Sequence, residues 1–131
     1  MKKPTSDRKD AKKLSNAKWD VLRNEMRQVM VETAKRGQLI TYSELCATLK
    51  TAYLHYHSSL LVKLLIEIGR AEAAEGRPVL PAVVVGKQSG MPGAGYFKID
   101  VDSDGEAAFD DPELMWRTDL EAVFQYWSEH E

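Results

Sequence analysis

Residues 14–76 carry three helical apolar stripes, and these stripes constrain the fold more than any other feature of the sequence. In the first stripe, Trp19, Leu22 and Met26 begin a series of apolar side chains at steps of three and four. This spacing places them on one face of a helix. Gly37 follows two basic residues and is a typical helix stop. The pattern therefore predicts a long first helix from about residue 14.

Two further helices are predicted after this glycine. Thr41 and Glu44 have the spacing of a capping box, in which the threonine hydroxyl and the glutamate carboxylate each accept an otherwise unpaired backbone N–H. Ser58 or Ser59 can cap a third helix, which has a broad apolar stripe and ends at Gly76.

The next segment is predicted to form a β-hairpin. Residues 79–85 are rich in valine, residues 96–101 alternate like a half-buried strand, and the connector 86–95 is rich in glycine. Asp111 and Pro112 then open a last helix. The order of these elements predicts an α+β fold, with a winged-helix-like three-helix core, a β-hairpin and an appended C-terminal helix.

The length of 131 residues suits one domain over residues 14–131, preceded by a basic arm over residues 1–13. The arm is nearly free of apolar side chains, so we expect it to be disordered. The net charge of −2 is unevenly distributed: residues 1–36 hold 11 Lys and Arg against 5 Asp and Glu, whereas residues 99–131 hold 1 against 11. The basic end can meet phosphates, and the acidic end would avoid them.

Several features predict a cytoplasmic protein. Cys46 is the single cysteine, which excludes an intramolecular disulfide and fits a reducing compartment. No apolar run approaches the roughly 18 residues of a membrane span, and no signal peptide is expected. Cys46 shares a helical face with leucines, so we interpret it as structural.

Three short motifs resemble the DNA-binding domain of the alkylated-DNA–protein cysteine alkyltransferases. Residues 40–45, Ile-Thr-Tyr-Ser-Glu-Leu, are similar to the start of a helix in that family. Residues 81–85, Pro-Ala-Val-Val-Val, lie where the family has Pro-Cys-His-Arg-Val, and residues 89–96 resemble its glycine-rich turn ending in Gly-Tyr. The resemblance covers roughly residues 17–98.

The resemblance implies DNA binding without repair. Ala82 stands where the family has its nucleophilic cysteine, Val83 where it has the activating histidine, and Val84 where it has an arginine. Aliphatic side chains can neither attack an alkyl carbon nor move a proton, so no enzymatic activity is expected. The third helix also has no arginine before Arg70 to replace a flipped base. Tyr42 is the counterpart of a tyrosine that lies beside a backbone phosphate.

The leading hypothesis is therefore a non-catalytic protein that binds nucleic acid, in the first instance duplex DNA. The start of the third helix would enter a groove, and nearby polar and cationic side chains would contact phosphates. The predicted nucleic-acid-binding residues are Tyr42, Lys50, Tyr53, His55, Tyr56, His57, Ser58, Lys63 and Lys87. The His-x-His pair lacks a third ligand of suitable spacing, so we expect no metal and no cofactor.

The alternative is a protein-interaction module, such as an immunity, antitoxin or defence-associated protein. Its basis is the acidic C-terminal third, which could contact a basic partner. Salt-dependent binding to DNA favours the first hypothesis, and recovery of one basic partner favours the second.

Overall fold

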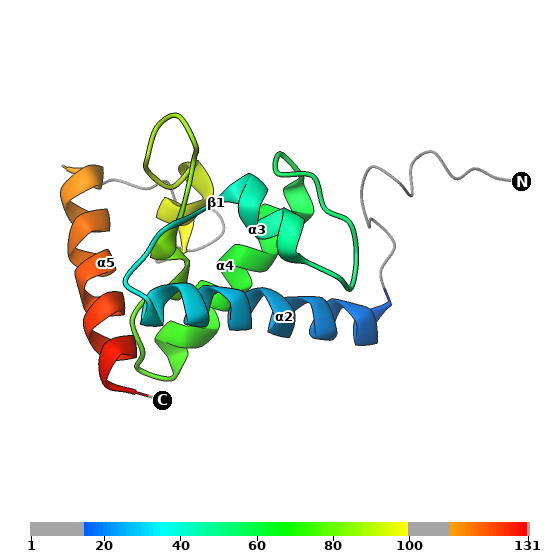
Figure 1. Cartoon of the computed structure of the whole chain (residues 1–131), viewed down its shortest axis with the longest axis horizontal. Helices are drawn as coiled ribbons and strands as arrows, with labels where there is room; N and C mark the ends of the chain where they lie inside the picture. Colours follow the sequence, from blue (N-terminus) through cyan, green and yellow to red (C-terminus); the bar gives the residue numbers. More distant parts are fainter. Residues whose placement is uncertain (1–14, 100–110, 131) are drawn as a thin grey trace, which may run out of the picture.

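The computed structural model describes residues 15–99 and 111–130. In these ranges the chain is mostly helical, with a small two-stranded parallel sheet, which agrees with a broad α+β class. The α-helices are α2 (Asn16–Lys35), α3 (Tyr42–Thr48), α4 (Ser59–Ala74) and α5 (Pro112–Glu129). The strands are β1 (Ile40–Thr41) and β2 (Val84–Val85), and the 3₁₀ turns are η1 (Leu80–Val83) and η2 (Ala94–Lys98). Figure 1 shows α2 along the length of the molecule and α5 across the end opposite the start of α2.

The predicted helix boundaries are confirmed by their caps. The Thr41 hydroxyl accepts from the Glu44 amide at 3.1 Å, and the Glu44 carboxylate accepts from the Thr41 amide at 3.0 Å, so the capping box forms. Ser58 caps α4 through the Leu60 amide. Gly37 and Gly76 have φ of 65° and 77°, the left-handed backbone that ends α2 and α4.

The core lies where α2, η1, α4 and α5 meet. Leu22, Met26 and Met30 project from α2 and are fully buried. Trp116 of α5 is also buried, and its Nε1 donates a hydrogen bond of 2.8 Å to the carbonyl oxygen of Ala82. Because η1 is held between α2, α4 and α5, the segment that bears Ala82 is enclosed by helices. Among the described residues, no helix is long and apolar enough to cross a membrane.

The predicted β-hairpin is wrong. Residues 80–83 form the 3₁₀ turn η1, and only Val84–Val85 is extended. These two residues pair in parallel with β1, with Ile40 opposite Val84, and not with residues 96–101. Pro81 explains the shortening, since proline has no N–H for a ladder and its ring favours the first turn of a helix. The three valines are buried because helices enclose the segment.

The second predicted strand, residues 96–101, is wrong for a different reason. Residues 94–98 form η2, in which side chains three apart lie on one side. Tyr96 and Ile99 have this spacing, and both are buried. In an alternating strand Tyr96 and Ile99 would point to opposite faces of the sheet, whereas the 3₁₀ turn directs both towards the core. The winged-helix hairpin is therefore absent from the described chain; residues 100 and 101, like the arm 1–13, lie outside it.

Candidate nucleic-acid interface

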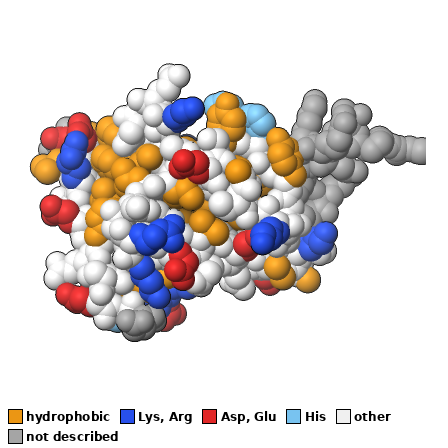
Figure 2. Space-filling model, in the orientation of Figure 1, with side chains coloured by type: hydrophobic (Ala, Val, Ile, Leu, Met, Phe, Trp, Pro, Cys, Tyr) orange, Lys and Arg blue, Asp and Glu red, His pale blue; other side chains and the backbone are white. Residues whose placement is uncertain are grey.

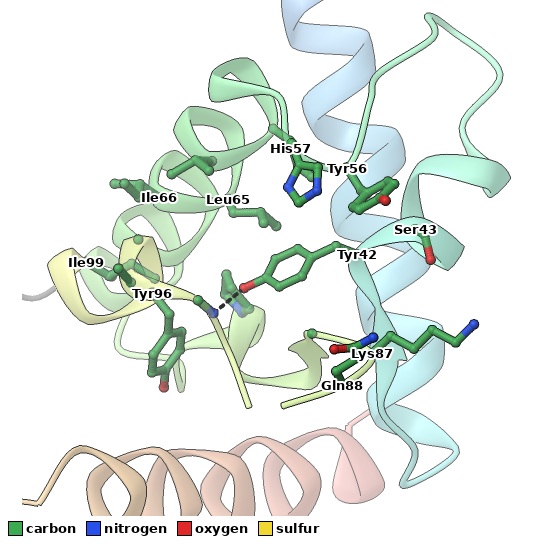
Figure 3. Close-up of a pocket in the computed structure, with 17 residues that line it drawn as sticks. Tyr42, Ser43, Tyr56, His57, Leu65, Ile66, Lys87, Gln88, Tyr96 and Ile99 are labelled. Atoms are coloured by element: carbon green, nitrogen blue, oxygen red, sulfur yellow. Dashed lines mark hydrogen bonds between the residues drawn. The ribbon is translucent and has the colours of Figure 1, made fainter. Parts of the chain in front are cut away.

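A pocket with a volume of about 700 Å³ opens between α3, the start of α4, the loop 86–95 and η2. Leu61, Leu65 and Ile66 of α4 supply its apolar floor. Lys87 and Gln88 of the loop contribute polar side chains to the wall (Figure 3). Such a volume is within the range of sites that bind small molecules or single bases.

A second pocket, of about 520 Å³, adjoins the first. Both pockets are lined by Ser43 and Tyr56, so they are neighbours across the start of α3. Lys50 and Tyr53 line the second pocket, together with His55 of the connector between α3 and α4. We call the residues that line the two pockets together the α3–α4 face.

The α3–α4 face is free of carboxylates among the described residues that line it. Its charged side chains are Lys50 in the second pocket and Lys87 in the first. His55 and His57 add two imidazole rings. In Figure 2, histidine and hydrophobic side chains lie side by side along one edge of the molecule. A surface with this composition attracts anions weakly and presents apolar area at the same place.

The connector carries neighbouring aromatic rings, of which His55 and Tyr56 are stacked while Tyr56 and His57 are tilted. The centroids of His55 and Tyr56 are 4.6 Å apart, and those of Tyr56 and His57 are 4.3 Å apart. Tyr53 is 57% exposed. Exposed rings of this kind can stack on nucleobases, which present a π-face whatever their sequence. Glu25 of α2 fixes the start of the connector, because its carboxylate accepts the backbone amides of residues 50 and 51 at 2.7 and 3.1 Å.

Tyr42 points into the first pocket (Figure 3). Its phenolic oxygen accepts a hydrogen bond of 2.7 Å from the backbone N–H of Gly93. Burial raises the pKa of Tyr42, and the hydrogen bond from Gly93 only partly opposes this effect. The hydroxyl therefore stays protonated at neutral pH. This orientation differs from the expected contact with an external phosphate.

The structure brings seven of the nine predicted site residues to the α3–α4 face. They are Tyr42, Tyr56, His57 and Lys87 at the first pocket, and Lys50, Tyr53, His55 and again Tyr56 at the second. The other two serve elsewhere. Ser58 is buried as the cap of α4, and Lys63 lies over the ring of Trp19, with Nζ 5.9 Å from its centroid.

Sequence reasoning missed the pocket itself, including Ser43, Gln88 and Gly93. The sequence predicts residues 86–95 as the connector of a β-hairpin. In that position they would lie away from Tyr42. The signal that could have found the pocket is the density of glycine over residues 86–95, because glycines allow a backbone to approach other groups closely.

Ala82 does not line either pocket; its neighbour Pro81 lines the first. Ala82 is fully buried, and its carbonyl oxygen is bound by Trp116. Within residues 15–99 and 111–130, no three His, Cys, Asp or Glu side chains are grouped so that they could hold a metal ion.

Comparison with protein-family models, with curated proteins and with solved structures gives no match for this chain. The alkyltransferase resemblance therefore stays a prediction that rests on short motifs.

Proposed function

We propose that this protein binds duplex DNA through the α3–α4 face and catalyses no reaction there. The observation that supports this most is the composition of that face. Two lysines, two histidines and four tyrosines line adjoining pockets without a carboxylate from the described residues. Phosphate affinity requires cations without competing acids, and stacking requires exposed rings.

The start of α4 is the part of the face that would approach the duplex. Val62 in its first turn is exposed, and His57 and Tyr56 stand shortly before it. A helix that follows a short helix and a connector, with its amino end exposed, has the arrangement that helix-turn-helix proteins use to enter a major groove. Backbone N–H groups at such an end also attract phosphate oxygens.

Absence of catalysis is proposed from the surroundings of Ala82. The site that the alkyltransferase resemblance equates with a reactive cysteine holds a methyl group, buried beneath Trp116. Val83 and Val84 beside it are also buried aliphatic residues. No group at these three positions can act as a nucleophile or transfer a proton.

The test is the salt dependence of binding to a fluorescent duplex, measured by anisotropy from about 50 mM salt upward. We expect the wild-type affinity to fall with salt. The K87A variant should reduce the slope of log K against log salt by about 0.9, the value for one phosphate contact.

The matched control is K35A, since Lys35 is an exposed lysine in the last turn of α2 and lies outside both pockets. An equal loss of slope in K35A and K87A would mean that binding is spread over the whole surface. No binding of any duplex at about 50 mM salt rejects the proposal.

The protein-interaction alternative depends on the acidic C-terminal third. Two of the acids on α5 are engaged within the fold: Glu113 pairs with Arg117 at 2.7 Å, and Asp119 accepts from the Tyr96 hydroxyl at 2.5 Å. Glu113 nevertheless stays 52% exposed, so α5 keeps acidic surface, and we favour the DNA hypothesis because of the composition of the α3–α4 face.

A further inference from the structure

We propose that Tyr42 is a positioning residue that holds the glycine-rich loop 86–95 against the first pocket, and that this loop gates access to the pocket. The inference concerns the pocket that the proposed function uses, but it stands on contacts within the protein. It also changes the role expected for Tyr42, from a phosphate contact to a support for the loop.

Hydrogen bonds within the loop close a turn over residues 86–91. The Gly86 amide donates to the Met91 carbonyl at 2.8 Å, and the Gly90 amide donates to the Gly86 carbonyl at 2.9 Å. Gly90 has φ of 70°, which this turn requires. The Ser89 hydroxyl bonds to the backbone of Met91. These bonds hold the turn 86–91 together but do not attach it to a helix.

The attachment to α3 is made at the other end of the loop. The Gly93 N–H donates to the Tyr42 hydroxyl of α3 at 2.7 Å, and the Gly93 carbonyl oxygen accepts from the Tyr96 N–H of η2 at 3.1 Å. Gly93 itself is exposed, so its amide can exchange this partner for water. A tie made by one hydrogen bond near solvent opens more readily than the core does.

The position of Tyr42 is much firmer than that of the loop. Tyr42 is the first residue of α3, directly after the capping box at Thr41 and the pairing of β1 with β2. Its ring is half-buried and packs against the core. The tyrosine therefore acts as the fixed partner, and the loop is the part that moves when the bond breaks.

The wall formed by the loop reaches α4 at Gly95. A Cβ added at Gly95 would lie 2.6 Å from Cγ1 of Val62, so the backbone is in direct contact with that side chain. Loss of the Tyr42 bond frees residues 93–95 to move away from Val62. Such a movement would widen the pocket over Leu65, which is 7% exposed.

The first measurement is amide hydrogen exchange on the protein without DNA, comparing wild type, Y42F and the control Y56F. Tyr56 lines the same pocket, and its hydroxyl makes no hydrogen bond to the loop within the described chain. We expect the Gly93 amide to exchange about tenfold faster in Y42F and at the wild-type rate in Y56F, while the amide of Val85 is unchanged in both. Equal exchange at Gly93 in wild type and Y42F overturns the proposal, as does a similar acceleration at Val85.

The second measurement reports on access to the pocket. A thiol introduced by L65C, in a C46A background, is treated with the thiol reagent 5,5′-dithiobis(2-nitrobenzoate). Adding Y42F should accelerate the reaction several-fold, and adding Y56F should not. The same rate with both substitutions contradicts gating. Because neither measurement uses DNA, failure of the DNA-binding proposal leaves both readouts interpretable.

Discussion

Replacing Glu72 by glutamine is expected to destabilise the folded protein by about 3 kcal/mol. Glu72 is a buried acid of α4, 1% exposed. Its two carboxylate oxygens accept from Arg27 of α2 at 2.7 and 3.4 Å and from Arg77 at 2.7 and 3.2 Å. The carboxylate therefore joins α2, α4 and the segment that leads to η1.

The magnitude follows from the unequal burial of the partners. Removing one member of a fully buried ion pair costs about 3–5 kcal/mol, because the other charge is left without compensation. Here the side chains of Arg27 and Arg77 are 33% and 27% exposed, so water can partly replace the lost carboxylate. The expected loss therefore lies at the low end of that range. Glutamine keeps the volume of glutamate, so no cavity adds to it.

The loss should depend on pH with a defined sign. Burial acts to raise the pKa of Glu72, but hydrogen bonds from Arg77 and Arg27 outweigh it, and the pKa is lowered from its ordinary 4.5. A lowered pKa in the folded state gives stability that is fully present above about 4.5 and is lost as the pH falls through the folded value. The difference between wild type and E72Q should therefore be largest near neutrality and shrink in acid.

Urea unfolding followed by circular dichroism, at pH 7 and at pH values below 4.5, measures the loss of unfolding free energy in E72Q and its dependence on pH. The matched control is E67Q, the same substitution on α4 at a residue whose side chain is 36% exposed, where less than about 1 kcal/mol should be lost. Equal losses in E72Q and E67Q, or a difference from wild type that does not change in acid, would refute the reasoning.

Two further substitutions test the packing around the candidate site. W116F removes the hydrogen bond to the Ala82 carbonyl and should cost about 2–3 kcal/mol in urea unfolding; W127F should cost about 1 kcal/mol less, since Nε1 of that buried tryptophan has no hydrogen-bond partner in the described chain. G95A places a methyl group against Val62 and should lower stability by about 1–2 kcal/mol in thermal unfolding, and adding V62A should recover most of it. Equal losses in the two tryptophan variants, or no recovery with V62A, would contradict these contacts.

The helices could be predicted from the sequence because their signals are local. The capping residues Thr41, Ser58 and Asp111 and the stop at Gly76 act on backbone groups within a few residues of themselves. Apolar side chains spaced three and four apart then define the buried face of each helix. Such features need no knowledge of what packs against them.

The strands could not be predicted in the same way. β1 and β2 have two residues each and pair across more than forty residues of sequence, a contact that no short pattern specifies. Val83 and Val84 are buried because η1 lies between helices, not because both faces of a sheet are covered. Pro81 was the local indication against a continuous strand, but the valine content of the segment favoured the strand prediction.

The candidate site was predicted in part, for a related reason. Tyr56, His57 and Lys87 are polar or aromatic residues in predicted connectors, where functional side chains commonly lie, and they do reach one face. The direction of Tyr42 depends on a bond to Gly93, fifty-one residues away, which the sequence does not reveal. Lys63 was included for its charge alone, and its position on α4 turns it towards Trp19.

The most direct test of the proposed function is a titration of isotopically labelled protein with duplex DNA at about 50 mM salt, followed by amide chemical shifts. The account predicts that the shifted amides cluster on the α3–α4 face, at residues 42–43, 55–59 and 87–88, and that α5 is unaffected. Shifts confined to α5, or no shift with any duplex, would contradict it.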